Sequence, residues 1–351
     1  MSKVLLGDVA VEHKETCKGS KDGYPIVGLE HLIPEEVTLT AWDEYSENTF
    51  TKMFRKGNML FGRRRAYLKK AAVAPFDGIC SGDITVIEAI PDRILPELLP
   101  FIIQNDALFD FAVGKSAGSL SPRVKWEHLK NYEFELPDMD KQRELAELLW
   151  AMDDTKKSYQ KLIATTDELV KSQFMEQFGA IDSEGSFARK QWKDVLKIVN
   201  GRDYKPIADP NGQYPVYGSG GLMGRATDYL CPEHTVVVGR KGTIDKPFVV
   251  DEKFWNVDTA FGVVPNQGVL HYLYLFWYCN QLDFKKLNKA STLPSTIKDD
   301  LLKLWINVPP YELQNEFAAL VRQPDKSKLE LEQAVSELTA TYKRIIAEKL
   351  G

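Results

Sequence analysis

Clusters of positively charged residues stand at matching places in the two halves of the chain. Arg63–Arg65 follow the apolar run Met59–Gly62, and Arg240 and Lys241 follow the apolar run Val236–Gly239. The planar fork of arginine can bond two acceptors on a guanine edge, whereas lysine acts as a point charge for phosphate. A single such cluster is as often a solvated charged hairpin as a DNA contact. Its recurrence at equivalent places in both halves favours contact with DNA.

The predicted DNA-binding set extends to neighbouring polar residues. It includes two lysines on the strand that returns from the first cluster, a serine in the glycine-rich turn Gly218–Gly221, and an arginine ahead of the first helical segment. The predicted DNA-binding residues are Arg63, Arg64, Arg65, Lys69, Lys70, Arg123, Ser219, Arg240 and Lys241. No acid interrupts residues 51–70, although the whole chain has a net charge of -5. One face can therefore be strongly positive in an acidic protein.

The sequence offers no catalytic constellation. The turn Gly218–Gly221 lacks the third glycine of a dinucleotide fingerprint, because residue 223 is methionine. The histidines have no serine or cysteine nucleophile motif near them, and the cysteines lack metal-ligand spacing. Glu233 with Asp251–Lys253 imitates a metal-dependent nuclease core, a short pattern that arises often by chance. We therefore predict no catalytic residues and no metal site, and a single-chain DNA nuclease with its own metal site stays open as an alternative.

Length and composition indicate a globular protein of two or three domains. The chain has 351 residues and 44% hydrophobic content, which is ample for proper cores. No apolar run reaches membrane-spanning length, and the first residues lack the charged and apolar regions of a signal peptide. We therefore expect a cytoplasmic protein.

A helical segment that occurs twice organises the chain. Residues 137–179 and 309–351 keep one register at a fixed offset of 172 residues, and apolar residues recur in each in steps of three, four and seven. Because Pro324 interrupts the second copy, we expect in each a short helix, a bend and a longer helix of about 24 residues, on the order of 36 Å long. Two such stripes can bury each other as antiparallel coiled-coil spacers. The residues predicted for the spacer and its partners are Leu145, Leu149, Leu162, Ile163, Val170, Phe174, Phe317, Val321, Val335, Tyr342 and Ile346.

The sequence outside these helical segments is also duplicated. Tyr24–Gly28 answers to Tyr214–Gly218, and Gly82–Asp92 answers to Asn256–Asn266, a match that pairs the third residue of the second run, Asp258, with Asp83. We predict an α+β fold with two mixed α/β domains in tandem pseudo-repeat, joined by two long antiparallel helical spacers. The predicted order is domain 1–136, spacer 137–179, domain 180–308 and spacer 309–351.

The duplicated arrangement resembles the specificity subunits of type I restriction-modification enzymes. The resemblance rests on the repeated helical segment and the runs Tyr214–Gly221, Val236–Gly242 and Trp255–Ala260, and it spans the entire chain. Its most specific parts are the repeated helical segment and Tyr214–Gly242. It implies a non-catalytic subunit with two target-recognition domains, each of which reads one half of a bipartite, asymmetric DNA site. The antiparallel helices would fix the gap between the halves.

The resemblance also implies partner subunits. Two modification subunits, which are adenine methyltransferases using S-adenosylmethionine, would dock along the spacers, and restriction-motor subunits using ATP and Mg²⁺ would join them. No cofactor is implied in this chain itself. A coiled-coil protein-binding scaffold with duplicated domains stays open as a second alternative, and it would show no salt-dependent binding to duplex DNA.

Overall fold

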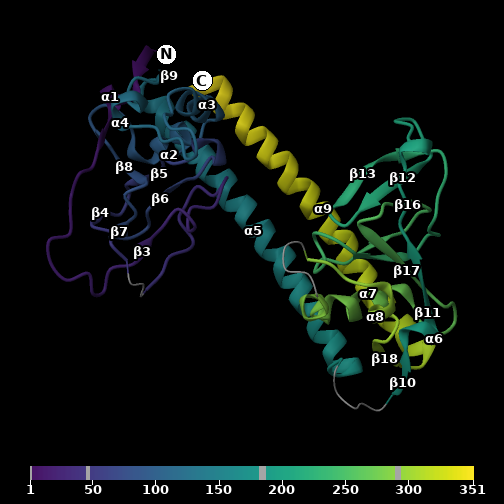
Figure 1. The fold of residues 1–351 in the computed structure, drawn as a ribbon. Coiled ribbons are helices and arrows are strands. Elements are labelled where there is room, and N and C mark those ends of the chain that lie inside the picture. Colours follow the sequence, from purple (N-terminus) through teal and green to yellow (C-terminus); the bar gives the residue numbers. More distant parts are fainter. Residues whose placement is uncertain (1, 45–47, 182–186, 289–293) are drawn as a thin grey trace. The chain divides into compact units, whose positions relative to one another are not determined.

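The computed structural model describes residues 2–44, 48–181, 187–288 and 294–351, with the backbone alone for Gln323 and Asp325. The chain divides into two compact units: unit 1 comprises Met1–Lys161 and Glu332–Gly351, and unit 2 comprises Leu162–Leu331. Each unit combines short strands and helices with part of two long helices (Figure 1). This confirms the predicted α+β class. Within the described residues, no helix is both long and apolar enough to cross a membrane.

Unit 1 is built on an antiparallel four-stranded sheet. Its strands are β1 (Ser2–Leu5), β2 (Ala10–Glu12), β3 (Ile26–Val27), β4 (Lys52–Phe54), β5 (Met59–Gly62), β6 (Ala71–Val73), β7 (Gly78–Cys80), β8 (Ile84–Ala89) and β9 (Glu133–Leu136). The four-stranded sheet has the order β2-β8-β5-β6, and a three-stranded sheet has the order β3-β7-β4 with β3 and β7 parallel. β1 pairs with β9.

Unit 2 repeats this plan. Its strands are β10 (Ala188–Gln191), β11 (Leu196–Asn200), β12 (Tyr214–Gly218), β13 (Gly221–Ala226), β14 (Thr235–Gly239), β15 (Phe248–Val250), β16 (Trp255–Asn256), β17 (Ala260–Pro265) and β18 (Trp305–Val308). The four-stranded sheet has the order β11-β17-β14-β15, which matches that of unit 1 strand for strand. β10 pairs with β18, as β1 pairs with β9.

The three-stranded sheets differ between the units. Both contain a parallel pair, β3 with β7 in unit 1 and β12 with β16 in unit 2. The third strand of unit 1 is β4, which pairs with β7, whereas the third strand of unit 2 is β13, which forms a hairpin with β12. The shared four-stranded sheet therefore carries two different attachments.

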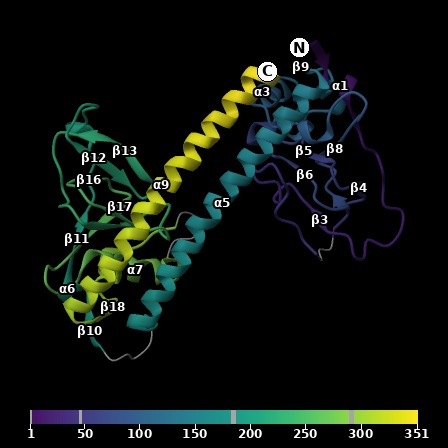
Figure 2. The same ribbon diagram turned by 180° about the vertical axis from the view of Figure 1, so that it is seen from behind.

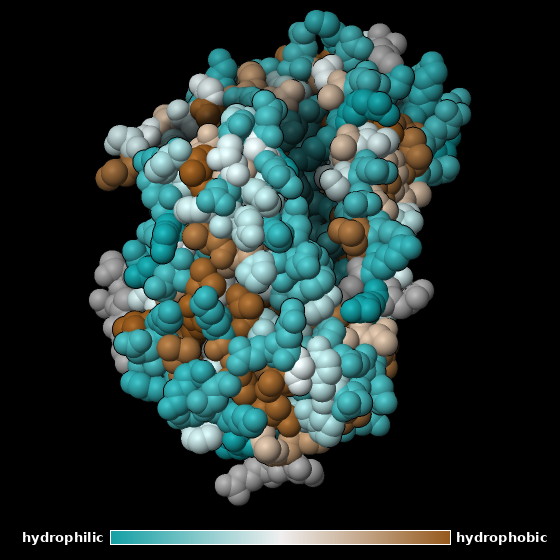
Figure 3. All heavy atoms as spheres, turned by 90° about the vertical axis from the view of Figure 1, so that its right-hand side faces the viewer, coloured by the Kyte–Doolittle hydropathy of each residue, from teal (hydrophilic) through white to brown (hydrophobic). Residues whose placement is uncertain are grey.

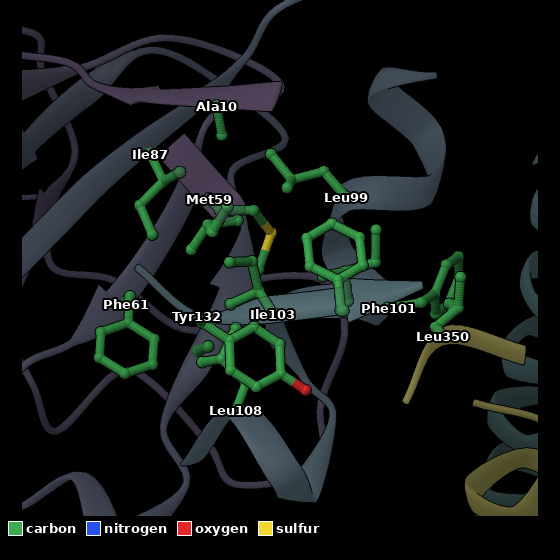
Figure 4. Close-up of a cluster of buried hydrophobic side chains, with 14 of the residues drawn as sticks. Ala10, Met59, Phe61, Ile87, Leu99, Phe101, Ile103, Leu108, Tyr132 and Leu350 are labelled. Atoms are coloured by element: carbon green, nitrogen blue, oxygen red, sulfur yellow. The ribbon is translucent and has the colours of Figure 1, made fainter. Parts of the chain in front are cut away.

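Short helices cover one face of each four-stranded sheet. In unit 1 they are α1 (Leu6–Val9), η1 (Ala66–Leu68), η2 (Pro96–Leu98), α2 (Leu99–Ile103), α3 (Asp106–Gly114) and α4 (Trp126–Leu129). In unit 2 they are α6 (Trp192–Val195), α7 (Tyr272–Gln281), η4 (Phe284–Leu287) and α8 (Lys298–Leu301), whereas η3 (Lys205–Ile207) packs on the three-stranded sheet. The apolar alternation of β5 explains the layering, because Met59 and Phe61 enter the core under the helices while Leu60 enters a second core on the opposite face. Figure 4 shows Met59 and Phe61 with Leu99 and Phe101 of α2 in the first of these cores.

The two long helices are α5 (Met139–Phe178) and α9 (Tyr311–Leu350). Their bounds differ by the offset of the sequence repeat. The predicted bend at Pro324 is wrong, because α9 continues through this proline as α5 continues through Met152. A proline inside a helix costs about 3 kcal/mol, and here packing on both sides overrides that cost. Val321 is buried before the proline, and Lys328 after it binds Asp167 of α5 at 2.7 Å within unit 2.

Each unit packs the start of one long helix and the end of the other against its sheet domain. In unit 1, Leu149 of α5 and Ile346 of α9 share one core. In unit 2, Phe317 of α9 stacks edge-on against Phe174 of α5, with ring centroids 5.5 Å apart. The long helices therefore pack together in opposite directions within each unit.

A buried glutamine at the same register ties each long helix to the domain before it. Gln142 Oε1 accepts from the Leu95 amide at 2.8 Å, and Gln314 Oε1 accepts from the His271 amide at 2.8 Å. The Nε2 group of each glutamine also donates to a proline carbonyl five residues earlier. These side chains satisfy backbone groups that packing would otherwise leave unpaired.

Candidate nucleic-acid interface

Arg63 and Arg64, the first cation turn, follow β5 and are held by main-chain hydrogen bonds. The Arg63 amide donates to the Asp83 carbonyl at 3.0 Å, and the Val124 amide donates to the Arg63 carbonyl at 3.0 Å. The turn therefore lies between the start of β8 and the segment that leads into α4. Three segments distant in sequence position these two side chains.

A carboxylate lies at the centre of this turn. Asp83 Oδ1 and Oδ2 accept from Arg123 Nε at 2.6 Å and Nη2 at 3.1 Å, and Arg64 Nη1 lies 3.6 Å from Oδ2. Arg64 Nη2 also donates to Ser121 Oγ at 3.1 Å. The hydrogen bonds from Arg123, and then the positive charges of the neighbouring arginines, hold the pKa of Asp83 below its ordinary value. The carboxylate is therefore ionised at neutral pH and orients the arginines.

An open groove runs along this cluster of Asp83, Arg64, Arg123 and Ser121. Its lining carries the cations Arg63, Arg123, Lys52 and Lys14 and the carboxylates Asp83, Glu12 and Glu15, together with Thr16, residues 49–51, Ser81 and Gly82. The Nε atoms of Arg63 and Arg64 are buried and have no hydrogen-bond partner among the described residues. The groove offers guanidinium donors, which suit a ligand with exposed acceptors, and its four cations exceed its three carboxylates by one.

The other predicted cations of unit 1 lie apart from this cluster. Arg65 is exposed, with φ at +55°, and begins η1. Lys69 Nζ binds Asp106 Oδ1 at 2.6 Å, at the start of α3. Lys70 Nζ donates to the Leu29 carbonyl at 2.7 Å. Lys69 and Lys70 are therefore engaged within the unit, whereas Arg65 faces solvent.

Arg240 and Lys241, the second cation turn, follow β14 in unit 2 and repeat the first in its backbone contacts. The Arg240 amide donates to the Thr259 carbonyl at 2.8 Å, and the Thr296 amide donates to the Arg240 carbonyl at 2.9 Å. A side chain at Gly239 would place its Cβ 1.9 Å from the Thr243 carbonyl oxygen. The close approach of the returning chain therefore requires glycine before the two cations.

The predicted Ser219 joins the second cation turn. Its Oγ donates to the Lys241 carbonyl at 2.7 Å, and its amide donates to Thr259 Oγ1 at 3.3 Å. The Lys241 side chain is exposed, and its Nζ lies 3.8 Å from Asp258. Arg240 lies over the ring of Phe261, with Cζ 5.6 Å from the ring centroid. The structure thus brings all three predicted residues of unit 2 together.

Sequence reasoning overlooked the residues that anchor the two turns. The strand ladder places Ile84 opposite Gly62 and Ala260 opposite Gly239. Asp83 therefore corresponds to Thr259, and its predicted pairing with Asp258 is wrong by one residue. The glycine that ends each apolar run, Gly62 or Gly239, marks the equivalent position in the two units. The residues that face these glycines across the ladder, Ile84 and Ala260, are therefore equivalent too.

The acidic pattern that imitates a nuclease core does not form a compact acidic site. Asp251 pairs with His234 at 3.0 Å. Within the described parts of the chain, no group of three or more His, Cys, Asp or Glu side chains is placed to hold a metal ion.

The predicted spacer residues differ in burial. Leu162 of α5 is 52% exposed. The residues buried in the unit cores are Leu149, Val170, Phe174, Phe317, Val321 and Ile346, and those partly buried are Leu145, Ile163, Val335 and Tyr342. The apolar stripe therefore supplies both core contacts and exposed leucine side chains.

Comparison with known proteins relates the chain to one family. Residues 186–339 match the family model described as type I restriction modification DNA specificity domain. No curated protein sequence matches the chain. The crystal structure of the type I restriction-modification system S subunit from M. genitalium has a TM-score of 0.64 at 13% identity, covering 98% of this chain and 94% of that one.

A second solved structure concerns complex assembly and conformational transition of the type I R-M system. One of its chains has a TM-score of 0.51 at 19% identity, covering 99% of this chain and 97% of that chain. At such identities the likeness concerns the fold, and it extends over the full length. Together with the family match, this confirms the resemblance in the sequence. Residues 186–339 therefore belong to the type I restriction modification DNA specificity domain family, and the whole chain is similar in fold to type I S subunits.

Proposed function

We propose that the chain reads a bipartite, asymmetric DNA site, with one half-site for each sheet domain. The first cation turn with Arg123, and the second cation turn with Ser219, are the proposed contact points. The observation that carries this proposal is the recurrence of one turn, at one ladder position and with one pattern of main-chain hydrogen bonds, ending in two cations in both units.

The individual cations suit different parts of the DNA. The Arg64 side chain is 39% exposed and is oriented by Asp83 and Ser121, so that its fork is prepared for a base edge. Lys241 and Arg65 are exposed and suit phosphate, which fixes position along the duplex without reading sequence. The net charge of -5 does not oppose this assignment, because the cations are concentrated locally.

The unlike three-stranded sheets support unlike half-sites. β4 in unit 1 and the β12–β13 hairpin in unit 2 attach to the same framework on different strands. We infer that the common sheet places the cation turns against the duplex while the attachments contact further, different bases in each half-site.

We further propose that α5 and α9 fix the gap between the half-sites and carry the partner subunits. Each helix has 40 residues and is about 60 Å long at 1.5 Å per residue. Exposed leucines on them offer apolar surface for two modification subunits. These leucines are Leu148, Leu162, Leu169, Leu320 and Leu329. S-adenosylmethionine, ATP and Mg²⁺ belong, in this proposal, to the modification and restriction-motor subunits.

Sequencing of methylated adenines tests the proposal as a whole. Cells that carry this chain with its modification subunits should show methylation at one split motif with two unlike halves. Four residues are then inserted in α5 between Thr165 and Thr166, with four in α9 after Glu330, near the Asp167–Lys328 ion pair. The insertion adds about 6 Å, the length of about two base pairs.

We expect the gap to lengthen by one or two base pairs while both halves stay the same. Recovery of the original gap would refute the spacing role of the helices. A continuous or symmetric motif in the wild type would refute the assignment of one half-site to each domain.

A further inference from the structure

The tip of the β12–β13 hairpin carries two adjacent, exposed apolar side chains. Gly218 pairs with Gly221 across the turn, and Leu222 and Met223 follow at once, with 63% and 55% of their surfaces exposed. Apolar residues reach the surface elsewhere on this protein too (Figure 3), so exposure alone carries no argument. The argument depends instead on the position of Leu222 and Met223 beside the second cation turn.

A β-bulge turns this part of the hairpin outward. The ladder steps from Tyr217–Leu222 to Val216–Gly224, so that Met223 is the extra residue on its strand. A bulge bends the strand and re-aims a side chain. The small core beneath the hairpin contains Val216 but neither of the two exposed residues. Figures 1 and 2 both show β12, β13 and β16 together, away from β10 and β18 within the unit.

The bulged residue lies over Gly218, beside the second cation turn. A Cβ added to Gly218 would meet Met223 Sδ at 2.7 Å and Thr259 Oγ1 at 3.1 Å, so the methionine lies over Gly218 next to Thr259. Ser219 of the same hairpin donates to the Lys241 carbonyl. The apolar tip and the exposed lysine therefore belong to one continuous surface.

We propose that the β12–β13 hairpin enters the major groove of one half-site, where Leu222 and Met223 contact thymine C5-methyl groups. The inference rests on the proposed function and adds a reading mode to it. A two-stranded ribbon fits the major groove, which is about 12 Å wide, but not the minor groove, about 6 Å wide. The thymine methyl is the apolar group that the major groove presents. Lys241 beside the hairpin meets the phosphates at the groove edge.

This reading belongs to the second domain alone. In unit 1 the third strand of the small sheet, β4, pairs with β7, and β3 has no hairpin partner of this kind in the described residues. The two half-sites should therefore differ in their response to the loss of a methyl group.

Replacement of thymine by deoxyuridine removes the methyl group and nothing else. The assembled complex of this chain with its modification subunits is titrated with duplexes in which each thymine of the methylated site is replaced in turn. We expect a loss of affinity of about fourfold for each contacted methyl group, confined to one half-site. The double variant Leu222→Ala and Met223→Ala should bind the thymine duplex more weakly and be indifferent to the replacement.

Val113→Ala, at an exposed apolar residue of α3 in unit 1, is the matched control and should keep the full response to deoxyuridine. Thermal unfolding checks that the double variant is folded. Indifference of the wild type to every replacement, or an undiminished response in the double variant, would overturn the hairpin assignment while leaving the split motif intact. Failure of the wild-type complex to bind its own methylated motif would instead overturn the proposed function.

Discussion

Replacement of Asp83 by asparagine would separate the two effects of this carboxylate on the first cation turn. Asp83 accepts two hydrogen bonds from Arg123 and lies 3.6 Å from Arg64 Nη1. It therefore positions two guanidinium groups and also cancels one positive charge. Asparagine keeps the size and one acceptor oxygen but removes the charge.

The two effects have different magnitudes. A hydrogen bond to a charged group contributes about 1.5–3 kcal/mol, and asparagine loses about one of the two bonds. The Arg123 side chain is 41% exposed, so solvent screening reduces the loss in unfolding free energy to about 1 kcal/mol. The extra positive charge steepens the dependence of log K on log salt by up to about 0.9 for binding to any duplex.

Fluorescence anisotropy of the assembled complex measures both effects. With an unrelated duplex, Asp83→Asn should bind more tightly at low salt. With the cognate duplex it should bind more weakly, because mispositioned arginines lose a base contact worth about 1 kcal/mol or more. The ratio of cognate to unrelated affinity should therefore fall about fivefold or more.

Asp92→Asn supplies the matched control, because Asp92 is an exposed acid of unit 1 and its loss changes the net charge equally. It should shift both duplexes alike. An equal shift for both duplexes in Asp83→Asn would mean that the carboxylate acts through charge alone, and the positioning argument would fail.

Three further predictions concern the helix contacts and the remaining cations. Gln314→Ala should lower the unfolding free energy by about 2–4 kcal/mol in urea titration, because it leaves the buried His271 amide unpaired and opens a cavity; the exposed Gln333→Ala should not. Arg65→Ala should weaken DNA binding and reduce the slope of log K against log salt by about 1, with the unfolding free energy unchanged. Lys70→Ala should instead lower the unfolding free energy and leave this slope unchanged. The reverse pattern would contradict the assignment. Burial lowers the pKa of His271 to about 4, below its unfolded value of about 6.5, so stability should decrease as pH falls between these values; His271→Asn should remove this decrease, and a retained slope would exclude His271 as its source.

The repeat and its helices could be predicted from sequence because they depend on local periodicity. A fixed offset and a stripe of apolar residues are visible without any long-range contact. The bend at Pro324 was wrong because helix propensity is a weak local preference, and burial of Val321 with the ion pair of Lys328 outweighs it. Gln142 and Gln314 were missed because an apolar pattern takes no account of buried polar side chains.

The cation turns could be found from sequence, but the division of labour within them could not. Arg63–Arg65 look alike in sequence, yet one faces a groove, one is held by Asp83 and one faces solvent. Lys70 was predicted as a DNA contact from its charge, and its Nζ donates to a carbonyl of its own unit, which the sequence does not indicate. These differences arise from pairings between distant segments, which the spacing of charges along one strand cannot reveal.

The core of unit 1 contains residues of both α5 and α9, which are synthesised at different times. Its core includes Ile346 and Leu350, which follow the whole of unit 2 in the sequence, whereas unit 2 is one continuous stretch. Translation at about 5–20 residues per second would delay completion of unit 1 by roughly 10–40 s after synthesis of its first segment, which ends at Lys161. During that interval the core around Leu149 lacks Ile346 and Leu350, so a truncation before Ile346 would damage unit 1 as well as α9.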